Sequence, residues 1–247
     1  NMRHQIGRGI ILAFLISFSE HKICIWSIGT DCSDVKSKNP QASSGVYSIQ
    51  PKGLKAPFKA YCEMRSDGGW TVVQRRSGAQ VKFNRKWAAY KNGFGNLTRK
   101  CHHRELDFAL TKGKTRKWTL RVDLWDHEGN TAFAEYSNFK LGNKKSGYKL
   151  HVKTYKGTAG DAIRGAYKGI DQNGIGFSTI DQDNDGCDPC LFGDILQNEC
   201  AASEGGGWWF SRCGSASLHG DYHPAGDHIG WGSGLHWDTW KRQLRTL

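Results

Sequence analysis

The chain has 247 residues, with 35 Lys and Arg against 23 Asp and Glu, and a formal net charge of +12. Hydrophobic residues make up 38% of it and ten residues are Trp, which argues against a disordered protein. The excess of positive charge favours anionic partners such as sulfated glycans or phospholipid surfaces. The basic residues are scattered, and no helix-turn-helix, zinc-finger or RNA-binding motif accompanies them, so we expect no nucleic-acid partner.

The first thirty residues are expected to be a leader. A basic stretch at 3–8 precedes the apolar run 9–18, and small residues then allow cleavage before Glu20. The run is too short to cross a bilayer and no later segment is longer, so we expect no membrane span. Eight cysteines fit an oxidising compartment. These features predict a secreted, extracellular protein.

Short segments with strand character follow, separated by turns. In the clearest of them, Trp118, Leu120, Val122 and Leu124 alternate with polar residues, which is typical of a strand with one buried face. By the same criteria we expect strands at 44–51, 58–64, 68–76, 116–126, 130–142 and 148–157. With 31 Gly in the chain, the pattern predicts a loop-rich α+β or mostly β protein.

Helical periodicity is limited. Phe83, Trp87 and Tyr90 have the spacing of one helix face, and Gly93 would end that helix. The segment 161–167 is expected to be a short helix at most. Beyond residue 167, Gly, Asp and Trp dominate and regular structure should fade.

Several segments together resemble the fibrinogen-related domain, the C-terminal module of fibrinogen chains. In chain order they are "DCSDV", "SGVYSIQP", "YCEM", "GGWTVVQRRSG", "FNRKWAAYKNGFGNL", "LRVDLWDHEG", "FSTIDQDND", "GGGWWFSRCGSASLHGDY" and "GLHWDTW". The resemblance implies an α+β fold with a small N-terminal disulfide subdomain, a central antiparallel sheet with helices, and a loop-rich C-terminal calcium subdomain. We therefore expect a leader at 1–30 and the domain at 31–247.

Two regions depart from the family pattern. The segment 98–113 replaces a "FWLG"-type sequence and introduces Cys101. The chain also stops at "KRQLRTL", whereas members continue and return a strand into the central sheet. Relative to the family the domain is thus expected to be truncated at its C-terminus, with an open sheet edge.

The cysteines are expected to form three local disulfides. The resemblance implies pairs Cys32–Cys62 and Cys200–Cys213. We interpret the closely spaced Cys187 and Cys190 as a third, structural pair. Cys24 and Cys101 then remain. They could pair with each other within one chain, but we expect them to link chains into a disulfide-bonded homo-oligomer.

Three aspartates alternate in "DQDNDGCDPC" at 181–190, a pattern that suits a hard cation such as Ca²⁺. An EF-hand would need Glu at position 192, which is Phe. The resemblance instead implies a calcium site formed by the side chains of Asp183 and Asp185 with the carbonyls of Cys187 and Pro189. An ordinary acidic turn is the alternative.

The same cysteines allow two other interpretations. A zinc site would need four reduced thiolates, which an oxidising compartment disfavours. A CxxC redox pair normally begins a helix, and Pro189 lies in a loop. We therefore expect a structural disulfide beside the calcium loop.

In lectin-like members an acetyl-binding pocket lies beside the second disulfide, next to an unusual peptide bond. Arg212–Cys213 matches that bond here, but Gly214 replaces the following His. The other positions that match the pocket are Glu204, Tyr222 and Trp231, and Ser203 and Gly232 replace polar groups that hold the fibrin knob peptide. The apolar floor is kept and the specific polar contacts are lost.

Catalysis is not expected, because no G-x-S-x-G elbow or other catalytic arrangement is present. Asn96, in "NLT", is a candidate glycosylation site. The main functional expectation is a secreted recognition protein that binds glycans or acetylated ligands with calcium. A ligand of a cell-surface receptor and a structural matrix component are the alternatives.

Overall fold

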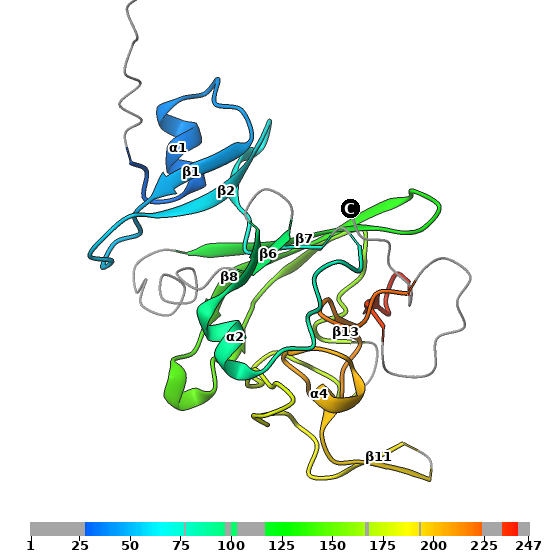
Figure 1. The fold of residues 1–247 in the computed structure, drawn as a ribbon. Helices are drawn as coiled ribbons and strands as arrows, with labels where there is room; N and C mark the ends of the chain where they lie inside the picture. The colour runs from blue at the N-terminus through cyan, green and yellow to red at the C-terminus, as the bar shows by residue number, and fades with distance from the viewer. Residues whose placement is uncertain are drawn as a thin grey trace, which may run out of the picture.

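The computed structural model describes residues 28–76, 78–96, 100–102, 117–165, 168–192, 194–223 and 234–241. Its N-terminal part is a small subdomain, at the top of Figure 1, in which one helix covers a three-stranded antiparallel sheet. The helix is α1 (Cys32–Lys38), and the strands, in sheet order, are β1 (Gly45–Ile49), β2 (Phe58–Arg65) and β3 (Gly68–Thr71). Of the expected leader at 1–30, only residues 28–30 are described, and Gly29 forms a bridge with Ile49 of β1. The bounds of the leader stay a prediction.

Helix α1 was not expected from the sequence. Asp31 is its N-cap, since the carboxylate accepts a hydrogen bond from Asp34 N–H at 2.9 Å. The helix buries Cys32 and Val35 against the sheet. A side chain at Gly69 would overlap the carbonyl of Cys32, so this glycine lets helix and sheet approach closely.

The expected strand 68–76 is divided between two sheets. Its first half is β3, which pairs with β2. Its second half is β4 (Gln74–Arg75), which pairs with β6 (Lys100–His102) and so joins β5 (Phe94–Asn96) in a separate sheet. Cys101 therefore lies in a strand, while Cys24 lies outside the described residues, and their pairing stays a prediction.

Helix α2 (Trp87–Asn92) is shorter than the apolar stripe suggested. Phe83 lies before the helix and is buried, so it belongs to the core without belonging to the helix. Gly93 follows the last turn with φ 71°, as expected for a residue that ends a helix.

The central sheet has the order β10-β8-β7, and β9 also pairs with β8. The strands are β7 (Trp118–Trp125), β8 (Thr131–Leu141), β9 (Leu150–His151) and β10 (Tyr155–Gly157). The expected strand 148–157 is thus two strands. Trp118, Leu120, Val122 and Leu124 pack on the core from one face of β7, as their alternation predicted.

A cavity of about 1170 Å³ lies beside the central sheet. Its lining includes apolar side chains of β7, β8 and the C-terminal part, among them Trp118, Val122, Phe139, Leu218 and Trp237. Among the described residues β7 is an outer strand of its sheet. One edge of β7 therefore has no partner strand among the described residues.

The C-terminal part is rich in loops, as expected, but it contains a hairpin that the sequence did not indicate. Its regular elements are β11 (Cys190–Phe192), β12 (Ile195–Gln197), α4 (Cys200–Ser203), β13 (Ala216–Ser217) and β14 (His236–Trp237). The 3-10 helix η1 (Lys144–Ser146) comes earlier, between β8 and β9. The β11–β12 hairpin projects from the lower end of the molecule (Figure 1). Among the described residues, no helix has the length and apolar character needed to cross a membrane.

Candidate calcium loop and ligand-binding surface

Three disulfides hold the chain at the positions expected from the sequence. Cys32–Cys62 joins α1 to β2 in the N-terminal subdomain. Cys200–Cys213 closes the loop that carries Trp208 and Trp209 and Cys187–Cys190 closes a tight turn before β11. The last two meet in the core, where the sulfurs of Cys187 and Cys200 are 3.4 Å apart.

The sulfurs of Cys187, Cys200 and Cys213 lie within 4.8 Å of one another, which is close enough for a metal site. Each of them, however, is bonded in a disulfide. A disulfide sulfur is not the thiolate ligand that zinc requires. The cluster is therefore structural, as the sequence interpretation proposed.

The three alternating aspartates have different partners. Asp181 Oδ1 accepts hydrogen bonds from Trp87 N–H at 2.7 Å and from the Thr179 hydroxyl at 2.8 Å. The bond from Trp87 N–H, at the start of α2, is the largest cause that holds the pKa of Asp181 below its ordinary value. Asp181 thus positions α2.

Asp185 connects the two ends of the segment from Cys187 to Cys200, which contains the β11–β12 hairpin. Its Oδ1 accepts a hydrogen bond from Cys187 N–H at 2.7 Å, and its Oδ2 accepts one from Cys200 N–H at 2.8 Å. The neighbouring Asp183 accepts a hydrogen bond from Asp185 N–H at 3.0 Å. The arrangement places the two carboxylates side by side at the base of the β11–β12 hairpin.

The donor set of this loop is suited to a hard cation. Burial, followed by the negative charge of Asp183, raises the pKa of Asp185 to about 6. A bound cation would offset the repulsion between these two carboxylates. Two carboxylates are fewer than the six to eight oxygens that calcium takes. The backbone carbonyls of Cys187 and Pro189, in the adjoining turn, and water would have to supply the rest.

Gly214 lies where lectin-like members have His, and the structure shows why no side chain is tolerated. Gly214 has φ 83°, and a Cβ there would overlap the amide of Gln172. Gln172 is fully buried, donates to Ala216 O at 2.8 Å and accepts from Trp208 Nε1 at 3.3 Å. Gln172 therefore occupies the space beside Gly214.

The sequence predicted an unusual peptide bond between Arg212 and Cys213, and the structure has an ordinary trans bond there. Every peptide bond among the described residues is trans, so that expectation was wrong. The departure is in Cys213 itself, whose φ of 56° lies in the left-handed region that non-glycine residues seldom adopt. Burial and the disulfide to Cys200 hold Cys213 in this conformation, while Arg212 is exposed.

Glu204 is the most perturbed acid of the expected pocket. It is 4% exposed, and its buried Oε2 has no hydrogen-bond partner. Burial, followed by the charge of Asp238, raises its pKa to about 9. The nearest base, His236 Nδ1, is 3.9 Å away, which is too far for a hydrogen bond, so Glu204 is better described as a neutral acid than as an ion pair.

The remaining residues of the expected pocket are only partly described. Tyr222 is half-buried and packs against the core, with its ring centroid 6.4 Å from that of His127. Trp231 and Gly232 lie outside the described residues. Asn96 is exposed at the end of β5. Glycosylation of Asn96 and the acetyl-binding pocket stay predictions.

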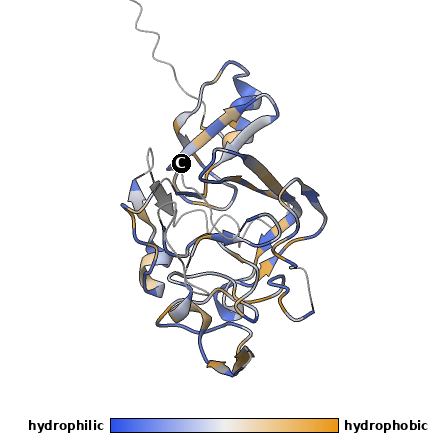
Figure 2. Ribbon diagram, turned by 90° about the vertical axis from the view of Figure 1, so that its right-hand side faces the viewer, coloured by the Kyte–Doolittle hydropathy of each residue, from blue (hydrophilic) through white to orange (hydrophobic). Residues whose placement is uncertain are grey.

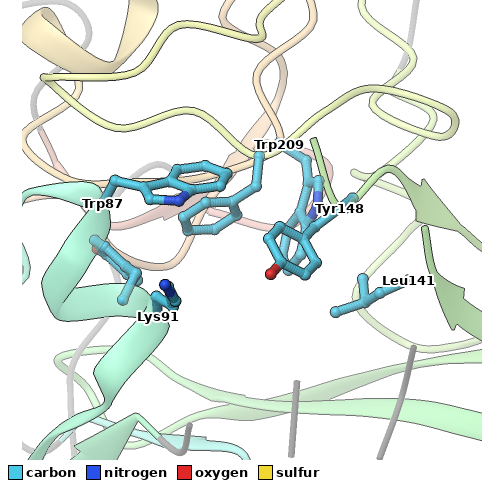
Figure 3. Close-up of a pocket in the computed structure, with 7 residues that line it drawn as sticks. Trp87, Lys91, Leu141, Tyr148 and Trp209 are labelled. Atoms are coloured by element: carbon cyan, nitrogen blue, oxygen red, sulfur yellow. Dashed lines mark hydrogen bonds between the residues drawn. The ribbon is translucent and has the colours of Figure 1, made fainter. Parts of the chain in front are cut away.

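The structure contains a small pocket that the sequence did not predict. A small pocket of about 40 Å³ is lined by Trp87, Tyr90, Lys91, Leu141, Tyr148, Phe177 and Trp209. Figure 3 shows Lys91 and the Tyr148 hydroxyl beside one opening, below Trp87. Trp209 Nε1 donates to Tyr148 O at 2.9 Å, which fixes two of its walls. The residues come from five separate segments, so no local sequence signal announces the pocket.

The β11–β12 hairpin was not predicted either, although it carries the two most exposed large hydrophobic side chains among the described residues. Leu191 and Leu196 are paired across the two strands and are 61% and 56% exposed. Cross-strand partners point to the same face of a hairpin. Figure 2 shows this hydrophobic hairpin at the lower end of the molecule.

Comparison with known proteins identifies the domain. Residues 28–247 match the family model of the C-terminal globular domain of fibrinogen beta and gamma chains. Fibrinogen-like protein 1 of Bos taurus is 40% identical over 220 residues, which cover 85% of this chain and 66% of that protein. Angiopoietin-1 of Canis lupus familiaris is 38% identical over 213 residues, which cover 85% of this chain and 39% of that protein.

Solved structures agree. The fibrinogen-like globe domain of human ANGPTL2 is 29% identical with a TM-score of 0.75, over 88% of this chain and 95% of that domain. Lamprey fibrin D-dimer, complexed with a Gly-His-Arg-Pro-amide peptide, is 31% identical with a TM-score of 0.76, over 88% of this chain and 71% of that one. Proteins of this group are not enzymes. The chain thus belongs to the fibrinogen C-terminal domain family.

Proposed function

We propose that this chain is a secreted, calcium-binding ligand of a cell-surface receptor, with residues 1–30 as its leader. It matches about two thirds of the length of the fibrinogen-like protein 1 relatives, and it is also related to angiopoietin-1. These relationships favour a receptor ligand over an acetyl-glycan lectin. The filled space beside Gly214 supports the same choice, because a polar wall of the lectin pocket has no room there.

The observation that carries the proposal is the exposed hairpin. Leu191 and Leu196 present adjacent apolar side chains to solvent at the end of a projecting element. Apolar groups gathered on such an element are typical of protein–protein contacts. The hairpin therefore supplies a candidate centre for receptor contact.

Calcium would stabilise this hairpin by binding to the loop from which the hairpin projects. Asp185 holds both Cys187 and Cys200, the residues that flank the hairpin segment. Fibrinogen C-terminal domains commonly have a calcium site, and here Asp183 and Asp185 with the carbonyls of Cys187 and Pro189 would hold the ion. Bound calcium would neutralise the paired carboxylates and stabilise the loop from which the hairpin projects.

Saturation binding of the labelled chain to intact cells tests the receptor contact. The cells are first treated with heparinase, so that glycosaminoglycans do not contribute. Replacing Leu191 and Leu196 by Ser should weaken binding about tenfold, since truncated apolar contacts of this kind cost 1–2 kcal/mol. The matched control replaces Ile180 and Val46, which are 45% and 39% exposed, by Ser. Equal binding by both double variants would refute the hairpin as the contact.

Thermal melting tests the calcium site separately. Calcium that binds only the folded chain should raise stability by about 2.7 kcal/mol at a hundredfold excess over its Kd. Asp183→Asn should abolish the rise in melting temperature. A wild-type melting curve that millimolar calcium leaves unchanged would exclude the site without affecting the receptor experiment.

A further inference from the structure

A basic hairpin lies between β8 and β9, beside α2 (Figure 1). Residues 140–153 carry five lysines and no Asp or Glu. We call this segment the basic hairpin, and its lysines are Lys140, Lys144, Lys145, Lys149 and Lys153. All five are exposed. Although the segment is a small part of the chain, it supplies five of the twelve net positive charges.

The backbone arranges these charges on one side of the segment. From residue 149 to 153, exposed and buried residues alternate, with Leu150 and Val152 inside. Lys149, His151 and Lys153 therefore face solvent together, at about 6.6–6.8 Å intervals along the extended chain. Lys140 is the cross-strand partner of His151 and lies on the same face. The result is a two-row basic surface.

Hydrogen bonds hold the turn that carries the remaining lysines. Gly142 N–H donates to Lys149 O at 2.8 Å and Ser146 N–H donates to Asn143 O at 3.0 Å. Gly147, with φ 62°, ends the turn and its carbonyl accepts from Phe177 N–H at 2.7 Å. An ordered turn presents its charges at lower entropic cost than a mobile loop would.

Carboxylates do not compensate this charge. Other lysines of the chain are paired, as Lys156 is with Glu135 at 2.8 Å and Lys38 with Asp34 at 3.0 Å. Within the part of the chain that the structure describes, none of the five lysines of the basic hairpin is in an ion pair. The positive potential of this surface is therefore available to a ligand.

We propose that the basic hairpin binds a linear sulfated glycosaminoglycan. Such a chain carries closely spaced negative charges, and binding it releases condensed counterions, as with other polyanions. A membrane surface is less suitable, because the apolar residues Leu141, Leu150 and Val152 are buried and membrane-binding segments expose apolar groups beside basic ones. The inference rests on the proposed extracellular location, but not on calcium or on the receptor.

Elution from immobilised heparin by a salt gradient tests the inference. The test variant carries Lys144→Gln, Lys145→Gln and Lys149→Gln. The control carries Lys52→Gln, Lys55→Gln and Lys59→Gln, which removes three equally exposed lysines from the N-terminal subdomain. The test variant should elute at lower salt and bind at least about tenfold more weakly at low ionic strength, with a shallower salt dependence. The control should change by less than about twofold.

Several outcomes would overturn the proposal. Equal weakening of both variants would show that only net charge matters. Undiminished binding to desulfated heparin would show that sulfate is not recognised. Tighter binding to phosphatidylserine vesicles or to duplex DNA than to heparin would assign the surface to a membrane or a nucleic acid. The circular dichroism spectra of the wild type and the two variants should match, so that a loss of binding is not a loss of folding. EDTA should not alter elution from heparin, so this test is independent of the calcium site.

Discussion

Gln172 fills the space into which a side chain at Gly214 would project. The two residues are held against each other because Gln172 bridges Trp208 and Ala216 through its buried amide. The glycine at position 214, where the resemblance to lectin-like members implies His, is therefore not an isolated surface residue. It is coupled to a buried hydrogen-bonded side chain more than forty positions earlier in the chain.

Restoring the histidine should therefore damage the fold without creating a lectin. We expect Gly214→His to lower the free energy of unfolding by about 2–4 kcal/mol, because it combines a left-handed backbone with a steric overlap. Urea denaturation measures the loss. Gly129→Ala is the control, since Gly129 has a similar φ of 88° with no atom near its missing Cβ, and it should cost only about 1 kcal/mol. A gain of acetylglucosamine binding by the histidine variant would contradict this account.

Asp183 and Asp185, the two aspartates of the candidate calcium loop, should behave differently without calcium. Asp185→Asn replaces one of two accepting oxygens by an amide nitrogen that faces a backbone N–H. It should therefore destabilise the chain by about 1–3 kcal/mol even in EDTA. Asp183→Asn keeps an accepting oxygen for Asp185 N–H and should change stability mainly when calcium is present. Equal losses for both variants in EDTA would show that Asp185 does not clamp the hairpin base.

Glu204 should make stability depend on pH. Its pKa is about 9 in the folded chain against an ordinary value of 4.5, so the folded chain retains a proton that the unfolded chain releases. The contribution of Glu204 to the free energy of unfolding is complete below pH 4.5. It falls as the pH rises towards 9, by at most about 1.4 kcal/mol per pH unit. Glu204→Gln should therefore gain stability relative to wild type between pH 5 and 8. Urea unfolding at a series of pH values measures this, and parallel pH profiles for the wild type and Glu204→Gln would contradict the prediction. Asp238 and His236 are the nearby titratable groups to substitute next.

Arg121 should matter more than an exposed ion pair. Its guanidinium contacts Glu135, and the two side chains are only 12% and 8% exposed. Arg121→Met should cost about 2 kcal/mol, because it leaves Glu135 with Lys156 as its remaining cationic partner. Asp123 keeps Arg65 at 2.9 Å.

The control for Arg121 is Lys38→Met, at an exposed pair with Asp34, which should change stability by less than about 0.5 kcal/mol. The double variant Arg121→Met/Glu135→Met should recover most of the loss if the buried charge is its cause. Chemical denaturation of the wild type, the two single variants and the double variant measures these changes in stability.

Local patterns in the sequence predicted the parts of the fold that local physics determines. The alternation in β7 is visible because each of its apolar residues faces the same core. Helix α1 was missed, although Asp31 was a readable N-cap signal, because seven residues are too few to show an apolar stripe. Where one strand was expected at 68–76, the chain changes sheets between Thr71 and Gln74, and only the pairing partners reveal it.

The candidate site shows the same division. Resemblance located Asp183 and Asp185, since a short motif carries them. The role of Asp181 at the start of α2 could not be foreseen, because its partner Trp87 is 94 residues earlier in the chain. The overlap between Gly214 and Gln172 and the pocket around Tyr148 likewise depend on contacts between distant segments.

The N-terminal subdomain has consequences for the order in which the chain folds during synthesis. Its helix, its three strands and the Cys32–Cys62 disulfide all lie between residues 31 and 71, so every contact within it is short in sequence. The C-terminal part, by contrast, is joined to the start of the domain by pairs such as Gln74 with Leu218 and Arg76 with Gly220, 144 residues apart. Segments of low contact order fold early and long-range pairings fold late. The subdomain should thus be complete, with its disulfide formed, while the segment 181–190 is still on the ribosome.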